Sequence, residues 1–155
     1  MTLLDILNEK VIKVELEAKD KEGALKELVG ILDESDLIKD PDMTLEAVKK
    51  REELMSTGIG HGVAIPHAKV EGVDKVIAAL GKSKEGIDFK ALDGEPVYIF
   101  FLLIAPEEDT SGYHIRALAR ISRFLKHGHF RERLKKTKTA KEILELIREE
   151  EEEHS

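Results

Sequence analysis

The sequence contains no cysteine among its 155 residues. A chain without thiols cannot form disulfides, bind zinc through thiolates or use a cysteine nucleophile. An excess of positive charge is also missing, because 25 lysines and arginines face 32 aspartates and glutamates and leave a formal charge of −7. Since the neutralisation of phosphates supplies much of the affinity for nucleic acids, this balance argues against a nucleic-acid partner.

Long apolar runs are absent as well. The longest, 97–105, has nine residues, whereas a membrane-spanning helix needs about 20. The N-terminus reaches Asp5 before any apolar run can form, which is not typical of a secretion signal. We therefore expect a cytoplasmic protein without direct membrane insertion.

Length and composition predict a single domain over residues 1–155. Hydrophobic residues make up 41% of the chain, enough for one ordinary core. No linker or repeat divides the sequence. The acidic run Glu149–Glu153 is expected to be a solvated helix end or tail.

Four segments have strand patterns. Residues 11–17 alternate between apolar and charged side chains and predict a half-buried strand. Residues 97–104 are apolar on both faces and predict a central strand covered from both sides. Further strands are expected at 63–65, where Pro66 should end the strand and turn the chain out of the sheet, and at 73–82.

Helices are predicted between these strands from caps and apolar periodicity. Asp20 can cap the first helix, and Asp40 followed by Pro41 marks the start of a second that runs to about Leu54. Its inward side chains are expected to be Leu45, Val48 and Leu54. Later helices are expected after Ser111 or Gly112, at 130–135, and after a capping box that begins at Thr139.

Strands that alternate with helices predict an α/β sandwich, in which a mostly parallel sheet lies between helix layers. Residues 83–90 leave room for one antiparallel edge strand. The glycine-rich segment 56–62 is expected to be irregular.

The chemistry is concentrated in residues 56–69. Glycines allow a sharp bend, and consecutive backbone N–H groups in such a loop can form an anion-binding concavity. His67 follows Pro66 and is expected at a strand end on a stiff support, where α/β sheets bind ligands. A neutral imidazole is a competent nucleophile for phosphoryl transfer.

A phosphoryl group on His67 would need positive charge and hydrogen-bond donors around its oxygens. The sequence offers the guanidinium of Arg51, the hydroxyls of Ser56 and Thr57, and the imidazole of His114 at a helix N-terminus. From the residues alone, a histidine such as His67 or His114 is more often a structural or surface residue, and Arg51 would ordinarily lie on a solvated helix face.

Several motifs resemble one protein family. Arg51-Glu52 is followed by Gly62-x-Ala64-x-Pro66-His67, the buried strand is entered through Asp93-Gly94-x-Pro96-Val97, and a histidine opens the next helix at His114. This pattern resembles the fructose/mannitol-type IIA domains (EIIA type 2) of the bacterial phosphoenolpyruvate-dependent sugar phosphotransferase system, a class that includes the nitrogen-regulatory IIA proteins. The resemblance covers about residues 2–148 and leaves the acidic end 149–155 outside.

The resemblance implies a mixed five-stranded sheet with helices on both faces. It implies that His67 accepts a phosphoryl group from the histidine phosphocarrier protein and passes it to a IIB partner, with His114 in contact with the group and Arg51 stabilising its charge. Since this chain has no cysteine, a separate partner must supply a cysteine-type acceptor. No cofactor or metal is implied, and the reactive nitrogen of His67 is left open.

Two functions stay open under this resemblance. In the first, the chain is a phosphocarrier for sugar uptake. In the second, it is a nitrogen-regulatory protein that uses the same phosphohistidine as a switch, which the chain length and the run Ser56–Gly60 favour slightly. A zinc site formed by His61, His67 and His114 is a third and weaker alternative, because no metal-ligand spacing supports it. His61 has no assigned role, and His127 and His129 are expected at the surface.

Overall fold

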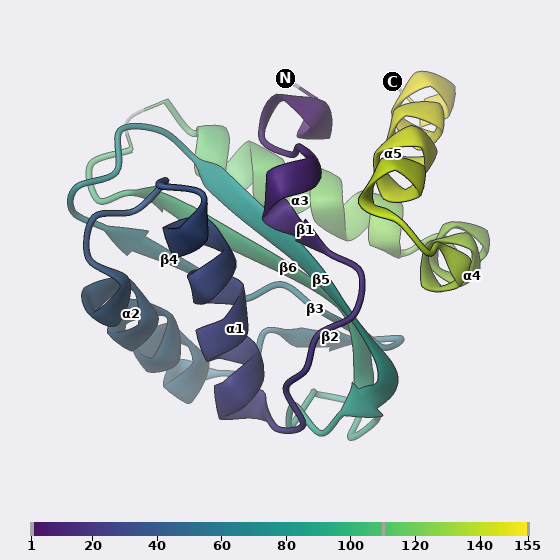
Figure 1. Cartoon of the computed structure of the whole chain (residues 1–155), viewed down its shortest axis with the longest axis horizontal. Helices are drawn as coiled ribbons and strands as arrows, with labels where there is room; N and C mark the ends of the chain where they lie inside the picture. The colour runs from purple at the N-terminus through teal and green to yellow at the C-terminus, as the bar shows by residue number, and fades with distance from the viewer. Residues whose placement is uncertain (1, 110, 155) are drawn as a thin grey trace.

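The structure is a computed structural model that describes residues 2–109 and 111–154. Its elements follow one another in blocks, with two short 3₁₀ helices near the N-terminus (Figure 1). After β1 come helices α1 and α2, then strands β2 to β6 without a helix between them, and then helices α3 to α5, so the alternation expected from the sequence is wrong. The strands are β1 (Ile12–Lys13), β2 (Gly58–Gly60), β3 (Val63–Ala64), β4 (His67–Val70), β5 (Ile77–Ile87) and β6 (Val97–Pro106). The helices are η1 (Leu3–Asp5), η2 (Glu9–Val11), α1 (Lys21–Glu34), α2 (Pro41–Leu54), α3 (Tyr113–Leu125), α4 (Gly128–Lys136) and α5 (Ala140–His154).

The sheet is mixed and is built around β6. Its strand order is β1-β5-β6-β3-β2, and β4 also pairs with β6. β1–β5, β3–β6 and β4–β6 are parallel, whereas β5–β6 and β2–β3 are antiparallel. Helices α1 and α2 cover one face and α3 the other (Figure 1), which confirms the predicted fold class.

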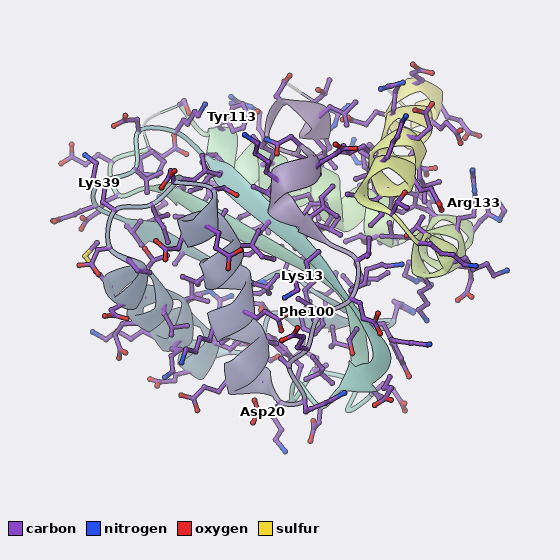
Figure 2. The ribbon with its side chains drawn as sticks, in the orientation of Figure 1. Lys13, Asp20, Lys39, Phe100, Tyr113 and Arg133 are labelled. Atoms are coloured by element: carbon purple, nitrogen blue, oxygen red, sulfur yellow. The ribbon has the colours of Figure 1, made fainter. Side chains whose placement is uncertain are left out.

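The core lies on both sides of β6, as its apolar sequence predicts. The side chains from Ile99 to Ala105 are at most 1% exposed. Phe100 points into the interior beneath α1, whereas Lys39 and Arg133 project from the periphery (Figure 2). The buried strand β6 therefore provides the fixed edge with which β3 and β4 pair.

The prediction that Pro66 turns the chain out of the sheet is wrong. Ala64 pairs with Phe100 and His67 with Leu103, so β3 and β4 keep one register along β6 across the proline. Proline has no N–H to donate, but its carbonyl accepts the Leu103 N–H at 3.0 Å, which keeps the chain on the sheet. His67 therefore opens a strand instead of following one.

Other boundaries also differ from the sequence predictions. The first strand keeps only Ile12–Lys13, because Val11 belongs to η2 and residues 14–17 lie outside the paired register with β5. The strand expected at 73–82 is β5, which starts at Ile77 and continues to Ile87, so residues 83–87 extend it and form no separate edge strand. The segment expected to be irregular contains β2.

Two burial predictions need correction. Leu54 is 82% exposed, because α2 turns its Thr44, Val48 and Glu52 side inward. The acidic run belongs to α5 and is only partly solvated. Glu151 is 5% exposed, since its carboxylate accepts the Leu3 N–H at 2.8 Å and the Arg120 Nε–H at 3.0 Å.

Candidate functional site

His67 is the first residue of β4, and its ring is half-buried. The Nδ1 atom lies 2.9 Å from the carbonyl oxygen of Ile65. A carbonyl can only accept a hydrogen bond, so Nδ1 carries the proton when the ring is neutral. The lone pair of the imidazole is then on Nε2, which is the nitrogen able to attack an electrophile.

His114 lies beside His67 although 46 residues separate them in sequence. The two ring centroids are 5.6 Å apart and the rings are tilted by 51°. His114 is the second residue of α3, and its backbone N–H donates to Asp109 Oδ2 at 3.1 Å. Within the described residues its Nε2 is buried and has no hydrogen-bond partner.

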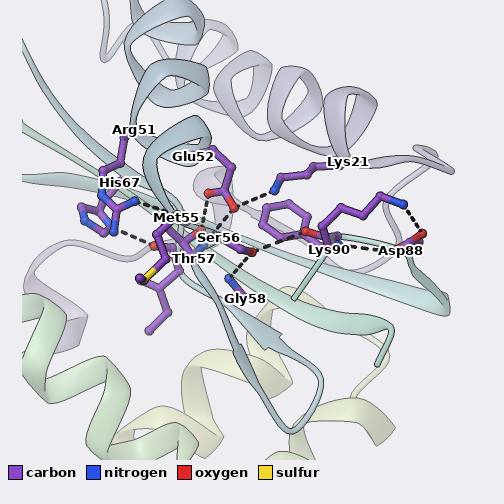
Figure 3. Close-up of polar contacts among 12 residues, drawn as sticks. Lys21, Arg51, Glu52, Met55, Ser56, Thr57, Gly58, His67, Asp88 and Lys90 are labelled. Carbon is purple, nitrogen blue, oxygen red and sulfur yellow. Dashed lines mark hydrogen bonds and ion pairs between the residues drawn. The ribbon is translucent and has the colours of Figure 1, made fainter. Parts of the chain in front are cut away.

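Arg51 approaches His67 from the last turn of α2 (Figure 3). Its Nη1 donates to the carbonyl oxygen of Met55 at 2.8 Å, which fixes the guanidinium at the end of the helix. The positive charge is close enough to His67 to disfavour protonation of the imidazole. The structure thus brings together His67, His114 and Arg51 from three separate elements.

Burial keeps both imidazoles neutral. Loss of solvation lowers the pKa of His67 more than any other effect, and Arg51 lowers it further, against the opposing hydrogen bond to Ile65. Burial likewise lowers the pKa of His114, with contributions from His67 and Lys69. At neutral pH the site therefore combines an unprotonated nucleophile with a fixed positive charge.

Comparison with known proteins identifies the family. Residues 5–150 match the family model described as phosphoenolpyruvate-dependent sugar phosphotransferase system, EIIA 2. The chain belongs to this family.

Relatives of both functional kinds are similar to the chain. A fructose-specific EIIABC component of Bacillus subtilis is 37% identical over 95% of the chain, which spans only 23% of that protein. A fructose-specific EIIA component of Haloferax volcanii is 33% identical over 90% of both chains. The crystal structure of nitrogen regulatory protein IIA-Ntr from Neisseria meningitidis superposes with a TM-score of 0.87 at 31% identity, covering 94% of this chain and 99% of that one.

The loop before the histidine of this EIIA domain does not form the expected anion cradle. The N–H groups of Thr57, Gly58 and His61 donate to Glu52, to Ser56 and to Asp93. The loop instead forms the β2–β3 hairpin, in which Gly60, His61 and Gly62 all have positive φ. The Gly62 carbonyl accepts N–H groups from Tyr98 and Ile99 of β6, so the hairpin anchors the strand that leads to the histidine.

The hydroxyls of Ser56 and Thr57 already have partners. Ser56 Oγ donates to the Phe89 carbonyl at 3.4 Å, and the buried Thr57 Oγ1 donates to Glu52 Oε2 at 2.6 Å. Their contact with a phosphoryl group stays a prediction, whereas their structural role is plain. No local pattern in the sequence predicts this role, because the acceptors lie on other elements.

The sequence did not predict the roles of two supporting groups, Glu52 and Asp109. The Glu52 carboxylate is 4% exposed and bridges Thr57 to Lys21, whose Nζ lies 2.9 Å away on α1 (Figure 3). Asp109 accepts the His114 N–H and also the Ser111 hydroxyl, so it holds the start of α3. An aspartate ahead of Ser-Gly is a helix-start signal that could have pointed to Asp109, but nothing in the pattern pairs Lys21 with Glu52.

Three other histidines lie away from this arrangement. His61 is exposed at the hairpin turn, and His127 and His129 are exposed around the start of α4, as expected. Across residues 2–109 and 111–154, no three histidine or carboxylate side chains gather in a way that could hold a metal ion. In the same residues, no helix is both long and apolar enough to span a membrane.

Proposed function

We propose that this EIIA domain is a phosphocarrier, in which His67 accepts a phosphoryl group from a histidine phosphocarrier protein and passes it to a IIB partner. One observation carries the proposal. The Ile65 carbonyl directs the His67 lone pair to Nε2, while a fixed guanidinium and a second imidazole lie beside the ring. This is the set of groups that phosphoryl transfer between nitrogen atoms requires.

In the forward step, Nε2 of His67 attacks the phosphorus of the donor's phosphohistidine. The new N–P bond forms as the donor's N–P bond breaks, and the electron pair of that bond returns to the donor imidazole. The Nδ1 proton stays on His67 and keeps its bond to the Ile65 carbonyl, which stabilises the positive charge that develops on the ring. Arg51 and the Nε2–H of His114 would face the oxygens of the transferred group, and a IIB nucleophile would then remove it by the same displacement.

The surface beside the histidine favours a protein donor and acceptor. Leu54 and Met55 lie three and four residues after Arg51 and are 82% and 60% exposed, and Ile115 follows His114 and is 69% exposed. Large apolar side chains clustered at a surface are typical of protein–protein contacts. A small-molecule phosphoryl donor would have no use for them.

The sugar-uptake role is our first proposal, with the reaction placed in the cytoplasm and without nucleic-acid or membrane contact. The nitrogen-regulatory role is the alternative, and the similarity to the Neisseria nitrogen regulatory protein favours it. Transfer of the phosphoryl group from the phosphorylated chain to a fructose-type IIB protein distinguishes the two roles. Rapid turnover supports uptake, and a stable phosphorylated chain in the presence of several IIB proteins supports regulation.

The phosphorylation itself is tested by incubation with phosphoenolpyruvate, the first enzyme of the system and the phosphocarrier protein. We expect one acid-labile phosphoryl group per chain, none in His67→Ala, and normal labelling in His61→Ala and His129→Ala. Proton–nitrogen correlation NMR of the product should place the group on Nε2. Normal labelling of His67→Ala would overturn the proposal, and a phosphoryl group on Nδ1 would overturn the assigned tautomer.

A further inference from the structure

A cavity of about 500 Å³ lies between the far half of β5, the start of β6 and the end of α4. Five lysines line it, although the chain as a whole is acidic, and Glu15 is the single carboxylate among the lining residues. The lysines come from three segments and are Lys82, Lys84, Lys135, Lys136 and Lys138. None of the lining residues belongs to the His67 site.

Lys82 gives the cavity a buried positive charge. Its side chain belongs to a residue that is only 6% exposed, and Nζ donates to the carbonyls of Leu134, Lys135 and Thr137 and to the Thr137 hydroxyl at 2.6–3.2 Å. All four acceptors are neutral, so no carboxylate in contact compensates the ammonium. Burial lowers the pKa of Lys82, against the opposing effect of the Glu142 carboxylate, and an anion nearby would stabilise the buried ammonium further.

Three of the four lysines at the rim have no salt-bridge partner among the described residues. Over the described part of the chain, Lys84, Lys136 and Lys138 make no salt bridge, and Lys135 reaches only Glu132 at 3.8 Å. The Lys135 ammonium lies 4.6 Å from the ring centre of Tyr98, which places it over one wall of the cavity. Four mobile ammonium groups thus surround a concave surface above a fixed one.

We propose that this cavity binds a small polyanion that carries two or more linked phosphate groups. Lysine ammonium groups act as point charges on flexible stems and suit phosphate oxygens. The Lys82 ammonium already donates to protein acceptors and contributes charge alone, but the four rim ammonium groups still exceed what one phosphate can use. The volume matches small-molecule pockets of roughly 300–1,000 Å³, and its concavity does not fit the flat surface of a membrane.

The test uses the full chain and inorganic pyrophosphate, followed by calorimetry and by backbone NMR at about 100 mM salt, where surface charges are screened beyond about 10 Å. We expect saturable binding with shifts confined to residues 82–84, 98 and 135–138. The triple variant Lys84→Gln/Lys136→Gln/Lys138→Gln should bind about tenfold more weakly, from about half a kcal/mol for each lost contact. The matched variant Lys39→Gln/Lys75→Gln/Lys126→Gln changes the net charge equally at exposed lysines outside the cavity and should keep its affinity.

Each alternative result is informative. No saturable binding, equal weakening in both triple variants, or binding only to anionic lipid vesicles would overturn the proposal. His67→Ala should bind pyrophosphate like the wild type, and loss of binding there would place the anion at the phosphoryl site and overturn the cavity. Adenosine triphosphate and inorganic tripolyphosphate distinguish the source of the phosphates, since tighter binding of the first indicates a nucleotide and equal binding a simple polyphosphate.

Discussion

Replacing Glu52 by alanine should destabilise the chain more than a typical single substitution. One carboxylate serves three donors, because Oε1 accepts the Thr57 N–H at 2.8 Å and the Lys21 ammonium at 2.9 Å, and Oε2 accepts the Thr57 hydroxyl at 2.6 Å. The Glu52 side chain is 4% exposed and that of Lys21 25%, so water cannot fully replace the lost acceptor. Alanine leaves two buried donors of Thr57 and one partly buried ammonium without their partner.

The expected loss is about 3–5 kcal/mol, the range for removing one member of a buried, hydrogen-bonded charge pair. That is a large part of the roughly 5–15 kcal/mol by which domains are stable. Glu52→Gln keeps an acceptor for Thr57 but removes the charge opposite Lys21, so it should lose about 1–3 kcal/mol. Glu53→Ala is the matched control, since Glu53 is the exposed neighbour and should change stability by less than about 0.5 kcal/mol.

The free energy of unfolding in urea, followed by circular dichroism, measures this series. A loss below about 1 kcal/mol for Glu52→Ala would refute the reasoning, because exposed ion pairs alone contribute that much. Equal losses in Glu52→Ala and Glu53→Ala would show that the helix end, and not the buried carboxylate, governs stability. Since Arg51 is the adjacent residue, a true loss at Glu52 should also slow phosphorylation of His67 in chains that remain folded.

Two further predictions concern the histidine site. Arg51→Ala should slow phosphorylation of His67 by about 10²–10³-fold, the usual cost of one preorganised charge donor, and Arg51→Lys should recover part of the rate because it keeps the charge without the planar fork. Rapid-quench labelling measures both rates, and Arg148→Ala on the exposed side of α5 is the control. An unchanged rate in Arg51→Ala would show that the guanidinium does not act at the site. Burial lowers the pKa of His67 and of His114 in the folded chain, so below about pH 6.5 the unfolded chain binds more protons and stability falls as the pH is lowered. The double variant His67→Gln/His114→Gln should reduce the pH dependence of the free energy of unfolding, measured by urea titrations between about pH 5 and 7, whereas His61→Gln/His129→Gln should keep it. The same pH dependence in both variants would show that the buried pair does not contribute.

Local signals predicted the elements that local chemistry determines. Asp20 and Asp40 do cap α1 and α2, with side chains that accept N–H groups three residues on. The apolar run of β6 predicted its central place, because only a strand covered on both faces needs no polar side. The residue types made His114 and Arg51 two of several candidates, and only the family resemblance singled them out as partners of His67, since no local pattern relates residues on β4, α3 and α2.

Non-local contacts account for most of what the sequence did not reveal. β2 and β4 are short and gain their hydrogen bonds from β3 and β6, which local propensity does not report. Leu54 has the apolar side chain of a core residue but lies on the outer side of α2. Glu52 shows the reverse, a charged residue turned inward because Lys21 and Thr57 meet it there.

Pro66, the residue before the histidine, affects both the course of the strand and the chemistry of the site. β3 does end before Pro66, as predicted, but the chain does not leave the sheet, because the Pro66 carbonyl accepts the Leu103 N–H while the proline nitrogen donates nothing. The Ile65 N–H donates to the Thr57 carbonyl, and the Ile65 carbonyl accepts the Nδ1–H of His67. The interruption in the strand therefore supplies the acceptor that fixes the imidazole proton on Nδ1. In the sequence Ile65-Pro66-His67, a backbone carbonyl thus determines the tautomer of the histidine, and no other side chain is needed for this.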